Sequence, residues 1–211
     1  MSILNATSIF DRLSDVPWET TTKIFGNSHA SYIGCIVQWW IQQDTEHNSV
    51  LESGPTHGYH RQGIGGGLCD AIFCIGQEAV GLLEVEGTRV LDTIDKITKF
   101  FQTQTLLLQK LQFAILVIYS YQQIGKGLNR SFKDIFASDI QQRVHEVSAQ
   151  HPDKSIIVIT VSKAYQRQRD NPRQLSEYYW GTTTDVTGIL YQQGEEVDRK
   201  VYFSQALDKP E

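Results

Sequence analysis

The segment 68–86 has the sequence LCDAIFCIGQEAVGLLEVE. Its first eight residues are apolar on both alternating faces except at Asp70, and its last eight are apolar on both faces up to Glu84 and Glu86. A strand that is covered on both faces has this pattern. Because a turn of only three residues separates the two runs, we predict an antiparallel hairpin at the centre of a sheet.

The three acids of this hairpin are predicted to lie together. Side chains alternate along a strand, so Glu84 and Glu86 share a face. Asp70 stands near the start of its strand, and antiparallel pairing brings it to the same end of the hairpin. Clustered carboxylates in a buried sheet repel one another and lose hydration, which a divalent cation would offset. Oxygen ligands suit Mg²⁺ or Mn²⁺. In the structural alternative, the two glutamates pair with Arg89 or Lys96. Asp70 is then hydrogen-bonded to the glycine-rich loop before it, which contains Gly63-Ile64-Gly65-Gly66-Gly67.

The spacing of apolar residues predicts further elements on both sides of the hairpin. We expect an α/β fold, with a mixed central sheet flanked by helices and a hairpin near the C-terminal end, because helices and strands alternate along the chain. The expected helices span about 17–25, 30–47, 89–101 and 132–147, and the expected strands span 50–53, 113–119, 156–161, 186–191 and 197–203.

With Asp70 on one strand, Glu84-Val85-Glu86 on the next, a long helix before them and helix, strand, helix, strand after them, the chain resembles the restriction-endonuclease-like, or PD-(D/E)XK, nuclease superfamily. The resemblance covers about 30–161 and leaves 162–211 as a C-terminal extension. It implies a metal-dependent nuclease with catalytic Asp70, Glu84 and Glu86. Asp70 and Glu84 would bind Mg²⁺ or Mn²⁺, and Glu46, or its competitor Glu52, would complete the metal shell.

The chain departs from the superfamily's motif at one position, because Glu86 stands where the usual lysine would be. Several restriction enzymes of the superfamily are similar in having Glu-x-Glu there. The change removes the ammonium group that normally orients the attacking water or stabilises the transition state. Lys96 or Lys99, in the following helix, would supply it from another direction; in the simpler interpretation both lie on a solvated helix face.

A basic segment follows the strand expected at 156–161. Residues 153–173 contain five basic side chains and two acidic ones, a local balance of +3. We predict that this segment contacts a nucleic acid backbone, because clustered Lys and Arg side chains neutralise phosphates. The alternative is an ordinary solvated loop. The residues assigned to nucleic acid binding are Lys163, Arg167, Arg169 and Arg173.

Composition limits the remaining possibilities. A chain of 211 residues with 40% hydrophobic residues suffices for one sizeable core, so we treat 1–211 as one nuclease-like domain. The net charge of −5 gives no global positive field, so phosphate contacts must be local. The three cysteines lie among apolar neighbours and suggest buried thiols. The N-terminal segment lacks signal-peptide features, and the longest apolar run is too short to span a bilayer, so we expect a cytoplasmic protein without a membrane partner.

The sequence therefore predicts a nuclease that hydrolyses phosphodiester bonds, with DNA as the expected substrate and a homodimer as a possible assembly by analogy with the superfamily. The alternative is a catalytically inactive protein of the same fold that binds nucleic acid or another protein. A third hypothesis, an unrelated α/β enzyme that binds a phosphorylated compound at the glycine-rich loop, is weaker because the loop lacks the lysine of a P-loop.

Overall fold

The computed structural model describes residues 6–18, 28–51, 69–103, 108, 110–119, 136–166 and 180–204. Its helices are α1 (Ala6–Arg12), the short 3-10 helix η1 (Leu13–Asp15), α2 (Ser28–Gln43), α3 (Val90–Gln102) and α5 (Ser138–Gln150). Its strands are β1 (Asn48–Leu51), β2 (Ala71–Ile75), β3 (Glu78–Glu86), β4 (Phe113–Tyr119), β5 (Ser155–Gln166), β6 (Trp180–Gln192) and β7 (Glu195–Ser204).

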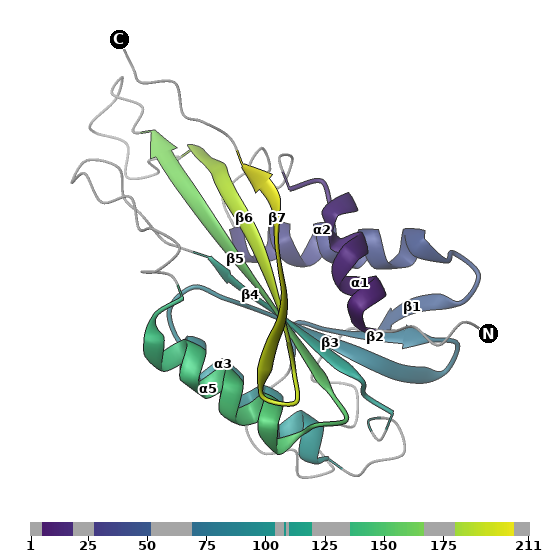
Figure 1. Ribbon diagram of the computed structural model, residues 1–211. Coiled ribbons are helices and arrows are strands. Elements are labelled where there is room, and N and C mark those ends of the chain that lie inside the picture. Colours follow the sequence, from purple (N-terminus) through teal and green to yellow (C-terminus); the bar gives the residue numbers. More distant parts are fainter. Residues whose placement is uncertain are drawn as a thin grey trace.

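The strands form one seven-stranded sheet in the order β1-β2-β3-β4-β5-β6-β7 (Figure 1). The central strands β3, β4 and β5 are parallel, and every other neighbouring pair is antiparallel. The two parallel connections contain α3 and α5, as helical crossovers between parallel strands require. The predicted α/β class with a mixed central sheet is therefore confirmed.

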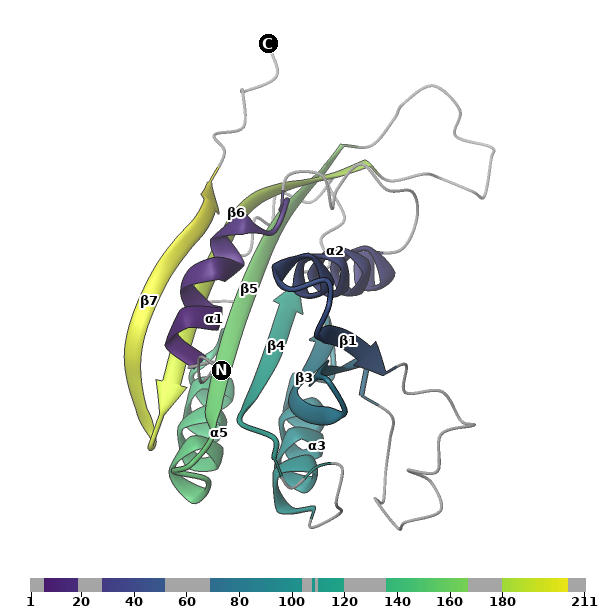
Figure 2. The same ribbon diagram turned by 90° about the vertical axis from the view of Figure 1, so that its right-hand side faces the viewer.

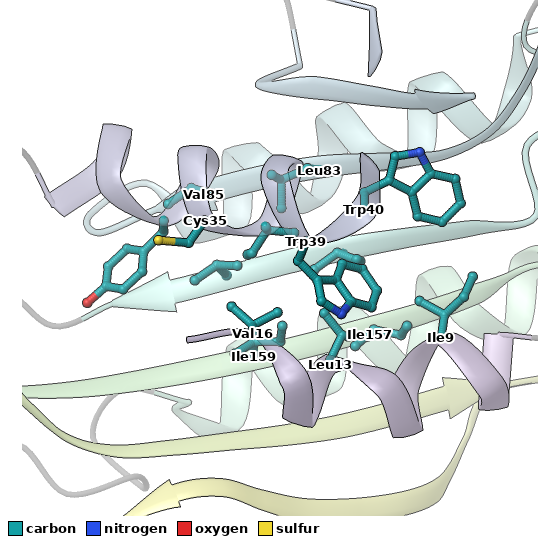
Figure 3. Close-up of a cluster of buried hydrophobic side chains, with 14 of the residues drawn as sticks. Ile9, Leu13, Val16, Cys35, Trp39, Trp40, Leu83, Val85, Ile157 and Ile159 are labelled. Atoms are coloured by element: carbon teal, nitrogen blue, oxygen red, sulfur yellow. The ribbon is translucent and has the colours of Figure 1, made fainter. Parts of the chain in front are cut away.

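Helices α1 and α2 cover one face of the sheet. Figure 3 shows side chains of these two helices directed toward those of β3 and β5, with Trp39 in the middle. The indole N–H of Trp39 donates to the carbonyl of Arg12 at 3.0 Å, and that of Trp40 donates to the carbonyl of Ser49 at 3.1 Å. These bonds let two large aromatic side chains be buried without leaving a polar group unsatisfied.

Helices α3 and α5 cover the opposite face, where Ile94 and Ile97 of α3 and Val144 and Val147 of α5 are buried. Both helices lie together on the side of the sheet away from α1 and α2 (Figures 1 and 2). Strand β4 is buried along its whole length, because it lies in the middle of the sheet and both of its faces are covered. This three-layer arrangement explains why 68–86 and 113–119 are apolar on both faces.

Several predicted boundaries differ from the structure. The helix expected over 30–47 begins earlier and ends at Gln43, and the strand expected over 50–53 is β1. The helix expected over 132–147 begins only at Ser138, with part of that range outside the described residues. Pro17 and Trp18 are not helical, and the rest of the helix expected over 17–25 lies outside the described residues. Helix α1 was not predicted, because seven residues give too few turns for a clear period.

Among the described residues, no helix is both long and apolar enough to cross a membrane.

Gly81 on β3 lies against the ring of Phe113, so a Cβ there would come within 2.2 Å of that buried side chain. We predict that Gly81→Ala lowers the free energy of unfolding by about 1–3 kcal/mol, the usual cost of overpacking a core. Gly34 on α2 is the matched control, because nothing lies within 4 Å of a Cβ built there. Gly34→Ala should stabilise the helix by about 0.5–1 kcal/mol. Denaturant unfolding measures both; equal stability of Gly81→Ala and the native protein would contradict the packing described here.

Candidate active site

The pairing of β2 with β3 brings Asp70 next to Glu84. Ala71, the first residue of β2, pairs with Leu83. Continuing this register by one residue places Asp70 opposite Glu84. The backbone N–H of Asp70 donates to the carbonyl of Leu83 at 3.1 Å, and the N–H of Val85 donates to Asp70 Oδ2 at 2.7 Å. The Asp70 carboxylate thus continues the hydrogen-bond ladder in place of a backbone carbonyl, which fixes its position at the end of the hairpin.

Glu84 is the most unusual acid in the described structure, because its side chain is only 2% exposed. Its Oε2 lies 2.6 Å from Lys96 Nζ, and its buried Oε1 has no hydrogen-bond partner among the residues that the structure describes. Burial raises the pKa of Glu84 to about 8; Lys96 opposes the shift, while the charges of Asp70 and Glu86 add to it. The pairing with Lys96 therefore does not fully compensate the burial of this carboxylate.

Lys96 reaches Glu84 from α3, whose first turn begins just after β3 ends. Its side chain is 23% exposed, so the expectation of a solvated position is wrong for this lysine. Lys99, one turn further along the helix, is exposed as the simpler interpretation expects. This ion pair is the one that the structural alternative expected for Glu84.

His29, which is not among the predicted site residues, is a further neighbour of Asp70. Its Nε2 lies 3.4 Å from Asp70 Oδ2, and its side chain is 37% exposed. His29 stands in the first turn of α2, on the face of the sheet opposite α3. The Asp70 oxygen that accepts from Val85 therefore also faces an imidazole, which helps to fix the orientation of the carboxylate.

Glu86 serves the turn between β3 and α3. Its Oε1 accepts hydrogen bonds from the backbone N–H groups of Gly87 and Thr88, each at 2.8 Å, and from the Thr88 hydroxyl at 3.3 Å. Burial alone would raise the pKa of this carboxyl, but backbone hydrogen bonds from Thr88, Arg89 and Gly87 outweigh it and lower the pKa. Glu86 stands at the predicted position on β3, but these contacts assign it to holding the turn.

Glu46 does not join the other acids. It follows α2 in an exposed turn, where its backbone N–H donates to the Asp44 carboxylate. The next residue, His47, accepts a hydrogen bond from Gly76 in the β2–β3 turn at 2.7 Å. This is the opposite end of β2 from Asp70, about 16 Å along a five-residue strand. The prediction that Glu46 completes a metal shell is therefore wrong. Its competitor Glu52 lies outside the described residues.

The predicted nucleic acid contacts are only partly described. The backbone of Lys163 belongs to β5, whereas Arg167, Arg169 and Arg173 lie outside the described residues.

A further feature of the site is how well Asp70 and Glu84 match the ligands that the predicted cation needs. In the described part of the chain, no group of three or more His, Cys, Asp or Glu side chains is arranged to hold a metal ion. Mg²⁺, however, is commonly held by one or two carboxylates and completes its shell with water and substrate phosphate. Glu84 fits such a site, because among the described residues its buried Oε1 lacks the hydrogen-bond partner that a buried oxygen needs.

The raised pKa of Glu84 makes stability depend on pH. The carboxyl has an ordinary value near 4.5 when unfolded and about 8 when folded, so its favourable contribution is fully present below pH 4.5 and is lost as the pH rises through 8. We predict that Glu84→Gln gains stability relative to the native protein over this window, by up to about 1.4 kcal/mol per pH unit. Thermal unfolding from pH 5 to 9 measures the difference. Glu46→Gln is the exposed control and should stay parallel to the native protein; a constant offset for Glu84→Gln would contradict the raised pKa.

Comparisons with known protein families, with curated proteins and with solved structures find no match, so the chemistry of this site has to be inferred from Asp70, Glu84, Lys96 and His29 themselves.

Proposed function

We propose that the protein is a metal-dependent nuclease whose substrate is DNA. The observation that carries the proposal is the end of the β2–β3 hairpin, where Asp70 is held by the backbone of Val85, its charge raises the pKa of the buried Glu84, and Lys96 contacts Glu84 at 2.6 Å. Two carboxylates and one ammonium group are the residue types that the resemblance to the PD-(D/E)XK superfamily implies. The ammonium group comes from α3 in place of β3.

The arrangement of the elements supports the same proposal. A long helix, α2, precedes the hairpin, Asp70 directly precedes β2, and Glu84 lies on β3. Helix α3, strand β4, helix α5 and strand β5 then follow in the order that the resemblance implies. The acids also lie at the carboxyl end of the parallel strand β3, where α/β proteins commonly bind ligands.

Each residue has a role in this proposal. Asp70 and Glu84 would hold Mg²⁺ or Mn²⁺, which supplies Lewis acidity toward a phosphate oxygen and an acidic bound water. Val85 and His29 hold Asp70 in position through its Oδ2. Lys96 favours the ionised form of Glu84 and places a positive charge beside the phosphate, where negative charge grows during hydrolysis.

One observation favours the alternative, an inactive protein of the same fold that binds nucleic acid or protein. Lys96 already pairs with Glu84, and Glu86 is occupied by the turn that follows β3. A metal-free site with a protonated Glu84 therefore leaves few charges uncompensated.

Metal binding separates the two functions. We predict that the native protein binds Mn²⁺ saturably in calorimetry at pH 8 and nicks plasmid DNA, and that Asp70→Asn loses both properties. The Asn side-chain oxygen still accepts the Val85 N–H, so this variant should keep its fold. Glu46→Gln is the matched control at the far end of β2 and should bind and cleave like the native protein. Absence of saturable Mn²⁺ binding to the native protein would reject the nuclease and favour the inactive module.

The role of Lys96 is tested by Lys96→Gln, for which we predict a fall in the rate of hydrolysis of about 10²–10³-fold, comparable to removal of one preorganised electrostatic donor. In this variant the pH at which Mn²⁺ binding weakens should also be higher than in the native protein, because Lys96 normally lowers the pKa of Glu84. Lys99→Gln, an exposed lysine of the same helix, should leave both measurements unchanged. Equal rates of hydrolysis for Lys96→Gln and Lys99→Gln would contradict the proposed role of Lys96.

A further inference from the structure

Strands β5 and β6 continue beyond both of their neighbours and form a two-stranded arm. The last residue of β4, Tyr119, pairs with Val161, and the last residue of β7, Ser204, pairs with Asp185. Beyond these points, 162–166 of β5 pairs only with 180–185 of β6 in the described part of the chain. Figures 1 and 2 show the two strands extending past the end of β4. We call the paired ranges 162–166 and 180–185 the arm.

The arm projects from the same end of the sheet as the acids. Strands β3, β4 and β5 are parallel, and Glu84 is level with Leu116 on β4 and with Val158 on β5. The arm therefore lies two strand spacings from Glu84, about 10 Å to the side. It begins four residues further along than Val158, and its five residues on β5 extend it by about 17 Å.

These dimensions match duplex DNA. The major groove of B-DNA is about 12 Å wide and admits a two-stranded β-ribbon. With a phosphate of one strand at Asp70 and Glu84, a ribbon about 10 Å to the side lies over the adjoining groove rather than over the same backbone. The A-form groove of duplex RNA is too deep and narrow for side chains to read, and a single strand has no groove.

The charge of the sequence in and beside the arm agrees with this substrate. The arm carries one base, Lys163, and one acid, Asp185, and the sequence 167–179 that connects its strands contains three arginines against two acids, which gives 162–185 a balance of +1. The chain as a whole carries a net charge of −5, so this segment is a local basic exception. Phosphates that flank a groove attract such a segment.

We propose that the arm enters the major groove of double-stranded DNA and so selects duplex DNA for cleavage at Asp70 and Glu84. This inference rests on the proposed nuclease function for its cleavage step, whereas the binding step can be measured by itself.

The test uses the full chain with Asp70→Asn, without divalent metal, so that binding is measured in the absence of hydrolysis. Fluorescence anisotropy compares a 20-base-pair DNA duplex, one of its strands and an RNA duplex of the same sequence. A second protein has 164–182 replaced by Asn-Gly, which joins the register partners Lys163 and Thr183 by a two-residue hairpin turn. We expect the intact arm to favour the DNA duplex by at least about tenfold, or 1.4 kcal/mol, and the shortened arm to lose this preference.

A milder variant keeps the test valid if the shortened protein does not fold. Lys163→Gln should reduce the slope of log affinity against log salt on duplex DNA by about 0.9, the value for one phosphate contact. Lys99→Gln, on α3, should not change it. The inference is overturned if the arm-shortened protein keeps full duplex affinity, if neither the shortening nor Lys163→Gln changes binding, or if single strands or RNA duplexes bind as tightly as duplex DNA.

The two proposals fail in different ways. Arm-dependent duplex binding by a protein that never hydrolyses DNA would support the arm and reject the nuclease. Hydrolysis by the native protein with no effect of the arm would do the reverse.

Discussion

The burial of Glu84 is the constraint on which the site depends. A carboxylate that is 2% exposed on a central strand loses most of its hydration, and in the described part of the chain Lys96 is the cation in contact with it. Lys96 can reach Glu84 because α3 starts immediately after β3 and runs back across the same face of the sheet. The turn that sets this direction is held by Glu86, which accepts the N–H groups of Gly87 and Thr88. The two glutamates therefore have different roles. Glu84 lies in the site, and Glu86 stabilises the turn before α3, the helix that carries Lys96.

The sequence predicted the hairpin and the position of its acids well, because alternation along a strand is a local property. The role of Lys96 depends on the rotation of α3 about its axis. The sequence pattern places Lys96 on the solvated face of this helix, whereas in the structure it faces Glu84. The residues one turn away from Lys96 on either side, Thr93 and Phe100, are 5% and 2% exposed. Lys99 instead follows Asp92 and Asp95, which are exposed. Residues three and four apart share a helix face. Lys96 therefore lies on the buried face of α3 and Lys99 on the exposed face.

The positions of His29 and Glu46 follow from topology rather than from local pattern. Only four residues, 44–47, connect α2 to β1, so the end of the helix must lie near the start of β1. Strand β1 is antiparallel to β2, and the end of α2 therefore lies beside the end of β2, far from Asp70. An acid that follows α2 cannot reach the site, whereas a residue in its first turn can. The short connection was visible in the sequence, but it could be used only once the pairing of β1 with β2 was known.

The balance of charge at the site decides between its two proposed functions. Lys96 contacts Glu84, backbone N–H groups stabilise Glu86, and Asp70 accepts from Val85 and faces His29. Among the described residues, the buried Oε1 of Glu84 therefore remains the place where a positive charge is lacking. A proton or a divalent cation can supply it, and the two compete for Glu84. With a pKa of about 8, the proton prevails at neutral pH unless a cation lowers that value by binding. An inactive module needs only the protonated form, whereas a nuclease needs the cation to displace the proton. The same buried oxygen that makes the folded protein sensitive to pH is thus the feature that would make it respond to a metal ion.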